Sequence, residues 1–155
     1  MTMIPRAAFV AAALAMSASA AQAGDIEAGA SAFQSQCQNC HNVVDSEGEV
    51  LAGRPNVRTG PNLYGVVGRQ AGTEDFRYGG SLVEAGEAGL VWDTENMVPY
   101  LLDPNTFLRD TLDNRRARSQ MSFRVRDDAT AENIIAFLAQ FGAVEDAEEE
   151  AAADS

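Results

Sequence analysis

The stretch from residue 43 to residue 89 places the strongest constraint on how this chain folds. It contains ten of the thirteen glycines and two of the five prolines, and its apolar residues follow neither the helical nor the strand period. Segments of this length without secondary structure are uncommon inside a compact domain. We therefore expect something other than regular hydrogen bonding to organise these residues, and a large prosthetic group would do so.

The two cysteines and the single histidine stand together, in the sequence Cys37-Gln38-Asn39-Cys40-His41. This C-x-x-C-H pattern is the attachment signature of haem c. Thiols at i and i+3 lie on one side of a helical turn, where they can bond the two vinyl groups of one porphyrin, and the next residue can place an imidazole nitrogen on the iron. The spacing predicts one covalent haem c, attached through Cys37 and Cys40, with His41 as an iron ligand.

Three other chemistries use a C-x-x-C pair. A thioredoxin-like redox pair follows a strand in a βαβ unit, whereas the pattern before Cys37 is helical. A structural zinc site needs four ligands, and this chain would have to complete it with a carboxylate. A disulfide across two residues would be strained and would leave His41 without a role. Haem c is the interpretation that uses all three residues.

The composition restricts the second axial ligand of the iron. The chain has no second histidine and no lysine, and only two methionines, Met97 and Met121, follow residue 23. Met97 falls in a helical apolar stripe, where methionine usually fills the core. Met121 falls in an irregular, arginine-flanked stretch, where a thioether can be directed at a metal. The residues favour Met121 and leave Met97, or an open or water-bound position, as alternatives.

Apolar residues near both ends of the chain recur at helical spacing. A first helix is predicted from residue 25 to about residue 40, with Asp25 at its N-terminus. A last helix is predicted with Asp128 or Thr130 as its cap and an end at Gly142. The apolar faces are Ile26, Ala30, Phe33 and Cys37 in the first helix and Ile134, Phe137, Leu138 and Phe141 in the last.

Two shorter helices are predicted between them. One is capped by Asp93 or Thr94 and ends near Asp103, although Pro99 removes a backbone hydrogen bond inside it. The other uses Asp103 as its cap and Pro104 as its first helical residue.

The first 23 residues have the pattern of an export signal. A short start with one positive charge, Arg6, precedes ten apolar residues (7–16), and small residues then lead to Ala21-Gln22-Ala23. Ten apolar residues are too few to span a membrane, which takes roughly 20. We expect residues 1–23 to be removed as a signal peptide, and we expect a periplasmic protein without stable membrane insertion.

The remaining chain divides into a domain and a tail. Residues 24–144 carry the helical patterns and the C-x-x-C-H motif, whereas residues 145–155 contain six acids and no arginine. A block of this kind cannot bury enough apolar surface to order itself, so it is predicted to be a disordered tail.

The net charge of −12 excludes one broad class of function. Without Arg6 it becomes −13, because ten arginines then oppose 23 carboxylates. Nucleic acids and anionic membranes bind proteins through a basic footprint, so we expect neither as a partner. The charge is uneven, since residues 109–126 carry six arginines and two aspartates, a local charge of +4.

Longer motifs resemble those of class I c-type cytochromes, and most of all cytochrome c2 of purple photosynthetic bacteria. The likeness covers residues 24–141, including insertions at residues 45–57 and 109–119. It implies an all-α fold of one domain wrapped around the haem, with the first and last helices crossing where Gly29 and Phe33 meet Ile134 and Phe137. The motifs are Thr59-Gly60-Pro61-Asn62-Leu63-Tyr64-Gly65-Val66-Val67-Gly68-Arg69, Gly89-Leu90-Val91-Trp92-Asp93, Tyr100-Leu101-x-Asp103-Pro104, Met121-Ser122-Phe123 and Ile134-Ile135-Ala136-Phe137-Leu138.

The resemblance also implies roles for single residues. Met121 would be the sixth ligand of the iron, and the Pro61 carbonyl would accept a hydrogen bond from the His41 ring and so orient it. Arg69, Tyr78 and Trp92 match positions that hydrogen-bond the haem propionates. Tyr100 matches a position beside the axial sulfur.

The function implied is that of a monomeric one-electron carrier, not an enzyme. Electrons would come from a cytochrome bc1-type complex and go to a photosynthetic reaction centre or a terminal oxidase. Family members present lysines around the exposed haem edge, whereas this chain has none. Arginines can replace them, because a guanidinium binds carboxylates bidentately, and the predicted docking face comprises Arg115, Arg116, Arg118, Arg124 and Arg126.

Two alternatives remain at this stage. A haem enzyme such as a peroxidase, or a gas sensor, would need an open sixth position on the iron. A subunit that delivers electrons inside a larger enzyme would use the same ligands as a free carrier.

Overall fold

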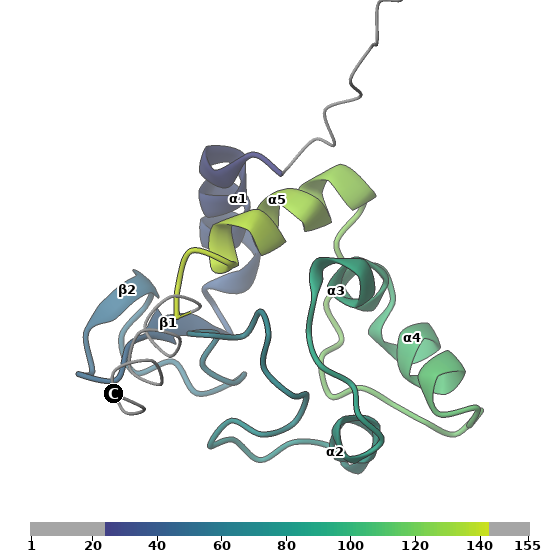
Figure 1. The fold of residues 1–155 in the computed structure, drawn as a ribbon. Coiled ribbons are helices and arrows are strands. Elements are labelled where there is room, and N and C mark those ends of the chain that lie inside the picture. The colour runs from purple at the N-terminus through teal and green to yellow at the C-terminus, as the bar shows by residue number, and fades with distance from the viewer. Residues whose placement is uncertain (1–23, 143–155) are drawn as a thin grey trace, which may run out of the picture.

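The structure, a computed structural model, describes residues 24–142. The predicted signal peptide (1–23) and the predicted acidic tail (145–155) lie outside the described residues. The elements in chain order are α1 (Ile26–Ala32), the π-helical turn η1 (Phe33–Cys37), β1 (Asn42–Val44), β2 (Val50–Gly53), α2 (Gly80–Glu87), α3 (Thr94–Leu102), α4 (Pro104–Thr111) and α5 (Asp128–Leu138). The prediction of a helical fold is confirmed, with one short hairpin added to it (Figure 1).

The first helix begins where the sequence indicates. Asp25 Oδ1 accepts hydrogen bonds from the backbone N–H groups of Glu27 and Ala28, at 2.9 and 3.0 Å, and so satisfies donors that a helix N-terminus leaves free. The helix widens into the π turn η1 at Phe33 and ends at Cys37. It is therefore shorter than predicted, because residues 38–40 form a turn instead of a further helical turn.

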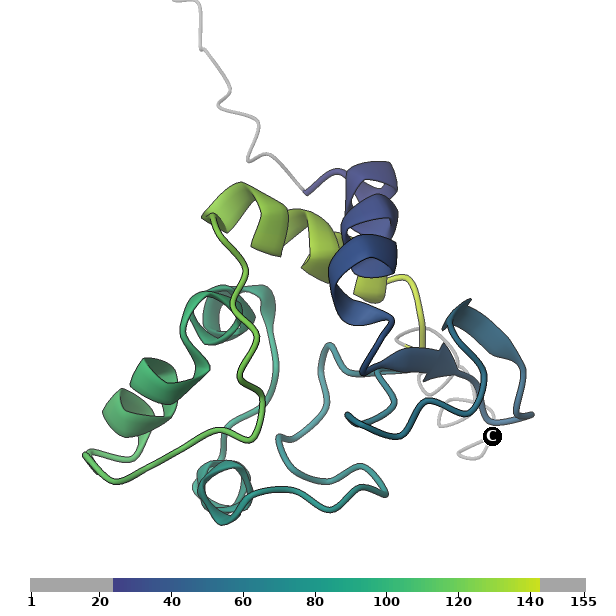
Figure 2. The same cartoon turned by 180° about the vertical axis from the view of Figure 1, so that it is seen from behind.

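The crossing of α1 and α5 is the main packing contact of the fold (Figures 1 and 2). Gly29 lies directly against the Asn133 carbonyl, and a Cβ at Gly29 would stand only 2.8 Å from the Phe137 Cβ. The rings of Phe33 and Phe137 pack at 5.5 Å beside this point, and Phe33 and Ile134 are 2% and 1% exposed. Glycine lets the two backbones approach, as the resemblance implied.

Gly29→Ala is expected to lower the free energy of unfolding by about 2 kcal/mol or more, because the new methyl group would overlap the Asn133 carbonyl. Gly80→Ala is the matched control: it starts α2, and a Cβ there meets nothing within 4 Å. We expect it to be neutral or to stabilise by up to about 1 kcal/mol. Urea unfolding of both variants measures the difference. Equal stabilities would show that the two helices do not approach this closely.

The predicted caps of the inner helices are correct, and that of the last helix is wrong. Asp93 caps α3 and Asp103 caps α4, with Pro104 as the first residue of α4. Asp127 caps α5, not Asp128 or Thr130: its backbone is extended, and its carboxylate accepts from the Thr130 N–H at 2.8 Å. A cap must lie outside the helical region and reach two or three residues ahead, which Asp128, already helical, does not do.

Two elements inside the glycine-rich stretch were not predicted. The hairpin β1–β2 is antiparallel with an irregular register, and its turn is held by Asp45 Oδ1, which accepts from Glu47 and Glu49 N–H groups at 3.0 and 2.8 Å. Helix α2 contains glycines that usually disfavour a helix. Gly86 is there for packing, since a Cβ would overlap the Ala71 carbonyl.

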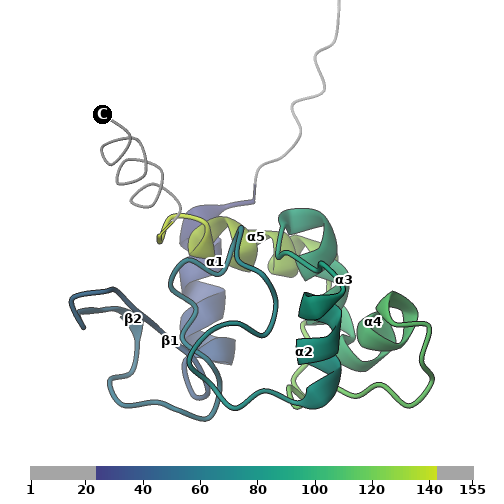
Figure 3. The same ribbon diagram turned by 60° about the horizontal axis from the view of Figure 1, so that its bottom comes forward.

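Residues 54–79 contain no helix and no named strand and run between the hairpin and α2 (Figure 3). The main cluster of buried side chains includes Val66 and Ala71 of this segment, and its other larger members are Phe33, Val43, Trp92, Met97, Val125, Ile134, Ile135 and Leu138. The longest described helix, α5, has 11 residues. Within residues 24–142 no helix has the length and apolar character needed to cross a membrane.

Candidate functional site

The imidazole of His41 is held in one orientation by the loop that faces it. The backbone N–H of His41 donates to the Cys37 carbonyl at 2.9 Å, and this hydrogen bond closes the turn after η1. His41 Nδ1 lies 2.9 Å from the carbonyl oxygen of Pro61. Because a carbonyl can only accept, Nδ1 carries the proton and Nε2 keeps a free lone pair, the arrangement usual for a metal-binding histidine.

The backbone of Gly60 supports the same ring. A Cβ at Gly60 would stand 2.7 Å from His41 Nδ1 and 2.9 Å from Nε2, so no larger residue fits here without moving the imidazole. The Gly60 N–H also donates to the Cys40 carbonyl at 2.7 Å. Burial lowers the pKa of His41, against the opposite effect of the Pro61 hydrogen bond. The neutral, metal-binding form of the imidazole is thereby favoured. Sequence reasoning singled out Pro61 and not Gly60.

Cys37 and Cys40 are not joined by a disulfide within residues 24–142. Cys37 is partly buried at the end of η1 and Cys40 is exposed in the following turn. Burial, with a smaller effect of Cys40, raises the pKa of Cys37 to about 11. No group of three or more His, Cys, Asp or Glu side chains in residues 24–142 is arranged to hold a metal ion.

Met121 lies in the extended segment between α4 and α5, and Ser119 holds that segment in place. Ser119 Oγ accepts from the Met121 N–H at 3.0 Å and lies 3.0 Å from the Tyr100 hydroxyl on α3. The Ser119 N–H donates to Asn105 Oδ1 on α4, also at 3.0 Å. Ser119 and Asn105 therefore tie the position of Met121 to two helices. Neither belongs to a motif that sequence reasoning could use.

The other methionine has a different environment. Met97 is on α3, is 6% exposed and belongs to the main buried cluster. Met121 is only partly buried and lies outside that cluster. This contrast matches a core role for Met97 and leaves the Met121 side chain available for another contact.

Trp92 and Tyr100 belong to one aromatic cluster with Phe107. The ring of Tyr100 lies 4.8 Å from that of Trp92 and 5.7 Å from that of Phe107, and Trp92 is 7% exposed. Burial raises the pKa of Tyr100, against the opposite effect of its hydrogen bond to Ser119. The hydroxyl thus stays protonated at neutral pH and can donate a hydrogen bond.

Arg69 and Tyr78 form a second group of predicted site residues. Arg69 Nη1 donates to the Tyr64 carbonyl at 2.8 Å and to Glu74 Oε2 at 2.7 Å, and Nη2 donates to the Asn62 carbonyl at 3.0 Å. Burial raises the pKa of Tyr78, while the nearby Arg69 cation lowers it. Glu74, which sequence reasoning missed, contacts both residues and so positions the guanidinium.

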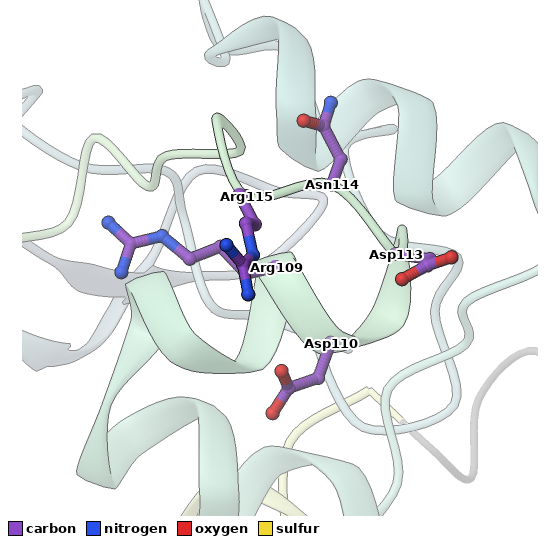
Figure 4. Close-up of a pocket in the computed structure, with 5 residues that line it drawn as sticks. All are labelled: Arg109, Asp110, Asp113, Asn114 and Arg115. Atoms are coloured by element: carbon purple, nitrogen blue, oxygen red, sulfur yellow. The ribbon is translucent and has the colours of Figure 1, made fainter.

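The predicted residues come from segments on different sides of the fold. The turn after α1, with the C-x-x-C-H motif, and the extended segment that leads to α5 lie on either side of residues 54–79 (Figures 1 and 2). A hollow elsewhere on the surface is lined by Arg109, Asp110, Asp113, Asn114 and Arg115 at the end of α4 (Figure 4). Of the predicted functional residues it contains only Arg115, which belongs to the predicted docking face.

Comparison with known proteins shows the family of this chain. The chain is 54% identical over 129 residues to cytochrome c-551 of Roseobacter denitrificans, covering 81% of this chain and 89% of the relative. It is 52% identical over 122 residues to cytochrome c2 of Cereibacter sphaeroides, covering 77% and 83%. The chain belongs to the cytochrome c2 family. A crystal structure of cytochrome c2 from Rhodobacter sphaeroides matches with a TM-score of 0.74 and 51% identity, over 77% of this chain and 97% of that one. No protein-family model matches.

Membership in the cytochrome c2 family establishes an electron carrier and not an enzyme. The cofactor is haem c, attached through Cys37 and Cys40. The described residues fit this group: the two thiols stand on one turn, and His41 Nε2 is left free by the Pro61 hydrogen bond. The predictions of family, fold and cofactor are confirmed.

Proposed function

We propose that this chain is a periplasmic carrier of single electrons, whose haem iron is bound by His41 and Met121. The observation that carries the proposal is the hydrogen bonding of Ser119, which anchors Met121 while Met97 is 6% exposed in the core. Haem supplies a reversible one-electron change at its iron, and a histidine–methionine pair raises its reduction potential. With both axial positions held by the protein, the iron has no place for a substrate.

The protein's part is to hold these groups still. Pro61 and Gly60 keep the His41 ring in one orientation, and Ser119 and Tyr100 hold the Met121 segment. A rigid surround keeps the geometry nearly the same in both oxidation states, which favours fast electron transfer.

A second role of the protein is to bind the haem propionates. We propose that Arg69, Tyr78 and Trp92 hydrogen-bond them, as the resemblance implies. The Arg69 guanidinium is already oriented by the Tyr64 and Asn62 carbonyls, so it would meet a propionate with little loss of conformational entropy.

We propose that the partners are a cytochrome bc1-type complex as donor and a photosynthetic reaction centre or a terminal oxidase as acceptor. They would dock on an arginine surface made of Arg115, Arg116, Arg118, Arg124 and Arg126, all of which are exposed. Arg124 already pairs with Asp103, at 3.1 Å. No other arginine of this surface forms an ion pair within residues 24–142, so those four supply most of the attraction for an acidic partner. Phe123, 44% exposed, adds an apolar contact beside them.

Arg116→Glu or Arg118→Glu is expected to slow the second-order electron transfer to the partner about tenfold at low ionic strength, because attraction between opposite charges mainly raises the association rate. The effect should fade with salt, since the Debye length is about 8 Å at 0.15 M and about 3 Å at 1 M. Stopped-flow kinetics with the purified complexes measure it.

The matched control is Arg54→Glu, the same charge reversal at an exposed residue just after β2. It should change the rate much less, and none of the three variants should move the reduction potential appreciably. Rates that respond to neither the arginine changes nor ionic strength would place the partner on another face.

A further inference from the structure

A groove runs between α1 and β2, and it reaches Gln38, which lies between the two haem-bearing cysteines. Its apolar lining comes from Ala30, Phe33, Leu51, Ala52 and Phe137, and its polar lining from Glu27, Ser31, Gln34 and Gln38. We name it the α1–β2 groove. Its volume of about 400 Å³ is enough for one or two large side chains.

Two exposed apolar side chains, Ile26 and Leu51, lie at this groove. They are 48% and 40% exposed, and among the described residues only Val50, Val91 and Phe123 are comparably large and exposed. Ile26 precedes Ala30 by one helical turn on the same side of α1, and Leu51 lines the groove itself. Single exposed apolar residues are ordinary, whereas a group of them around a hollow marks an interaction site.

The segments that carry the groove have an excess of negative charge. Residues 24–53 contain five carboxylates (Asp25, Glu27, Asp45, Glu47 and Glu49) and no lysine or arginine, and the exposed Arg54 directly follows Gly53 of the lining. Glu27 lines the groove, and the exposed Glu49 directly precedes Val50. The excess of negative charge disfavours an anionic occupant and favours one that brings positive charge as well as an apolar side chain.

The groove is separate from the arginine surface. Figures 1 and 2 both show α1 and β2 on one side of the molecule and α4 with the segment after it on the other. A protein bound at the groove would therefore leave the arginine surface accessible. The two surfaces also have opposite charge, −5 for residues 24–53 and +4 for residues 109–126, so one kind of partner cannot satisfy both.

We propose that the α1–β2 groove is a second docking site, which binds a cationic amphipathic segment of another protein. One leucine-like side chain of that segment would lie against Phe33 and Leu51, and its lysines or arginines would meet Glu27 and Glu49. Such a site would let a partner retain the carrier without blocking electron transfer. A second copy of this chain is a poor occupant, because a net charge of −12 on each copy opposes association.

The test is a titration of the reduced, haem-bearing protein with a 14-residue helical peptide of leucines at i, i+4 and lysines elsewhere, followed by ¹H–¹⁵N NMR. Shifts are expected along α1 and β2. Leu51→Asn should weaken binding about tenfold and Glu27→Gln about threefold. The same peptide with glutamate in place of lysine should not bind.

Each variant has a matched control elsewhere on the surface. Val91→Asn removes an apolar side chain of similar exposure (44%), and Glu87→Gln removes one charge from an exposed position on α2. Neither should change the affinity measurably. All four positions are exposed, and thermal unfolding checks that each variant remains folded.

Three results would overturn the proposal. Equal loss of peptide affinity in Glu27→Gln and Glu87→Gln would mean that the peptide responds only to the net charge of the protein. Shifts centred outside α1 and β2 would place the binding elsewhere. Self-association of the protein that Leu51→Asn abolishes in sedimentation would make a second copy the occupant.

Discussion

Met121→Ala is expected to open the sixth position of the haem iron, so that the ferrous protein binds carbon monoxide and the unmodified protein does not. The reduction potential should fall by on the order of 0.1 V, because axial ligands govern this quantity and methionine raises it. Absorption spectra with and without carbon monoxide, together with a redox titration, measure both effects. The chain contains one histidine and no lysine, so neither a second imidazole nor a lysine amine can take the open position.

Met97→Ala is the matched control for this prediction. Met97 is 6% exposed in the main buried cluster, so its removal should cost about 2–4 kcal/mol of stability and leave the iron closed. Carbon monoxide binding by Met97→Ala and not by Met121→Ala would make the proposed ligand wrong. Ready binding by the unmodified protein would favour the alternative of a haem enzyme or gas sensor with an open position.

Without haem, the chain is expected to lose most of its ordered structure. Residues 54–79 contain no helix and no named strand, yet Gly60 and Pro61 from this loop must be held against His41. A group that binds only the folded chain stabilises it by its binding free energy. Removing haem should therefore have a larger effect than any single substitution named above.

The double variant Cys37→Ser, Cys40→Ser tests this expectation. Circular dichroism should show little helix and no cooperative melting, and haem staining after denaturing electrophoresis should disappear, whereas the unmodified protein keeps its stain. A haem-free chain that melts cooperatively with native helix content would show that protein contacts alone organise the loop.

Local chemistry in the sequence was enough for several features of this protein. The C-x-x-C-H motif predicts the cofactor because the required atoms lie within five consecutive residues. Asp25, Asp93 and Asp103 were identified as caps because a cap bonds only two or three residues ahead. The helical face of α5 is equally local, although the helix ends at Leu138 and not at Gly142, and its cap is Asp127, one residue before Asp128 and three before Thr130.

Other features could not be predicted from the local sequence, because they depend on contacts with residues distant in the chain. Helix α2 was not predicted, because its glycines weaken the helical pattern of the local sequence. Gly86 is needed there because any larger residue would overlap the Ala71 carbonyl. The hairpin β1–β2 depends on pairing across a turn held by one aspartate, Asp45. In both places tertiary packing outweighed local propensity.

The sequence by itself determined the cofactor, the helical class of the fold and the two methionines between which the sixth ligand had to be chosen. Only the tertiary structure decided how those residues are held. The hydrogen bond from Ser119 to Asn105 spans 14 positions and that between Ser119 and Tyr100 spans 19. The Gly60 backbone packs against the ring of His41, which lies 19 positions earlier in the chain. Such contacts leave no periodic or spacing signal, because they form only when separate segments are brought together by packing.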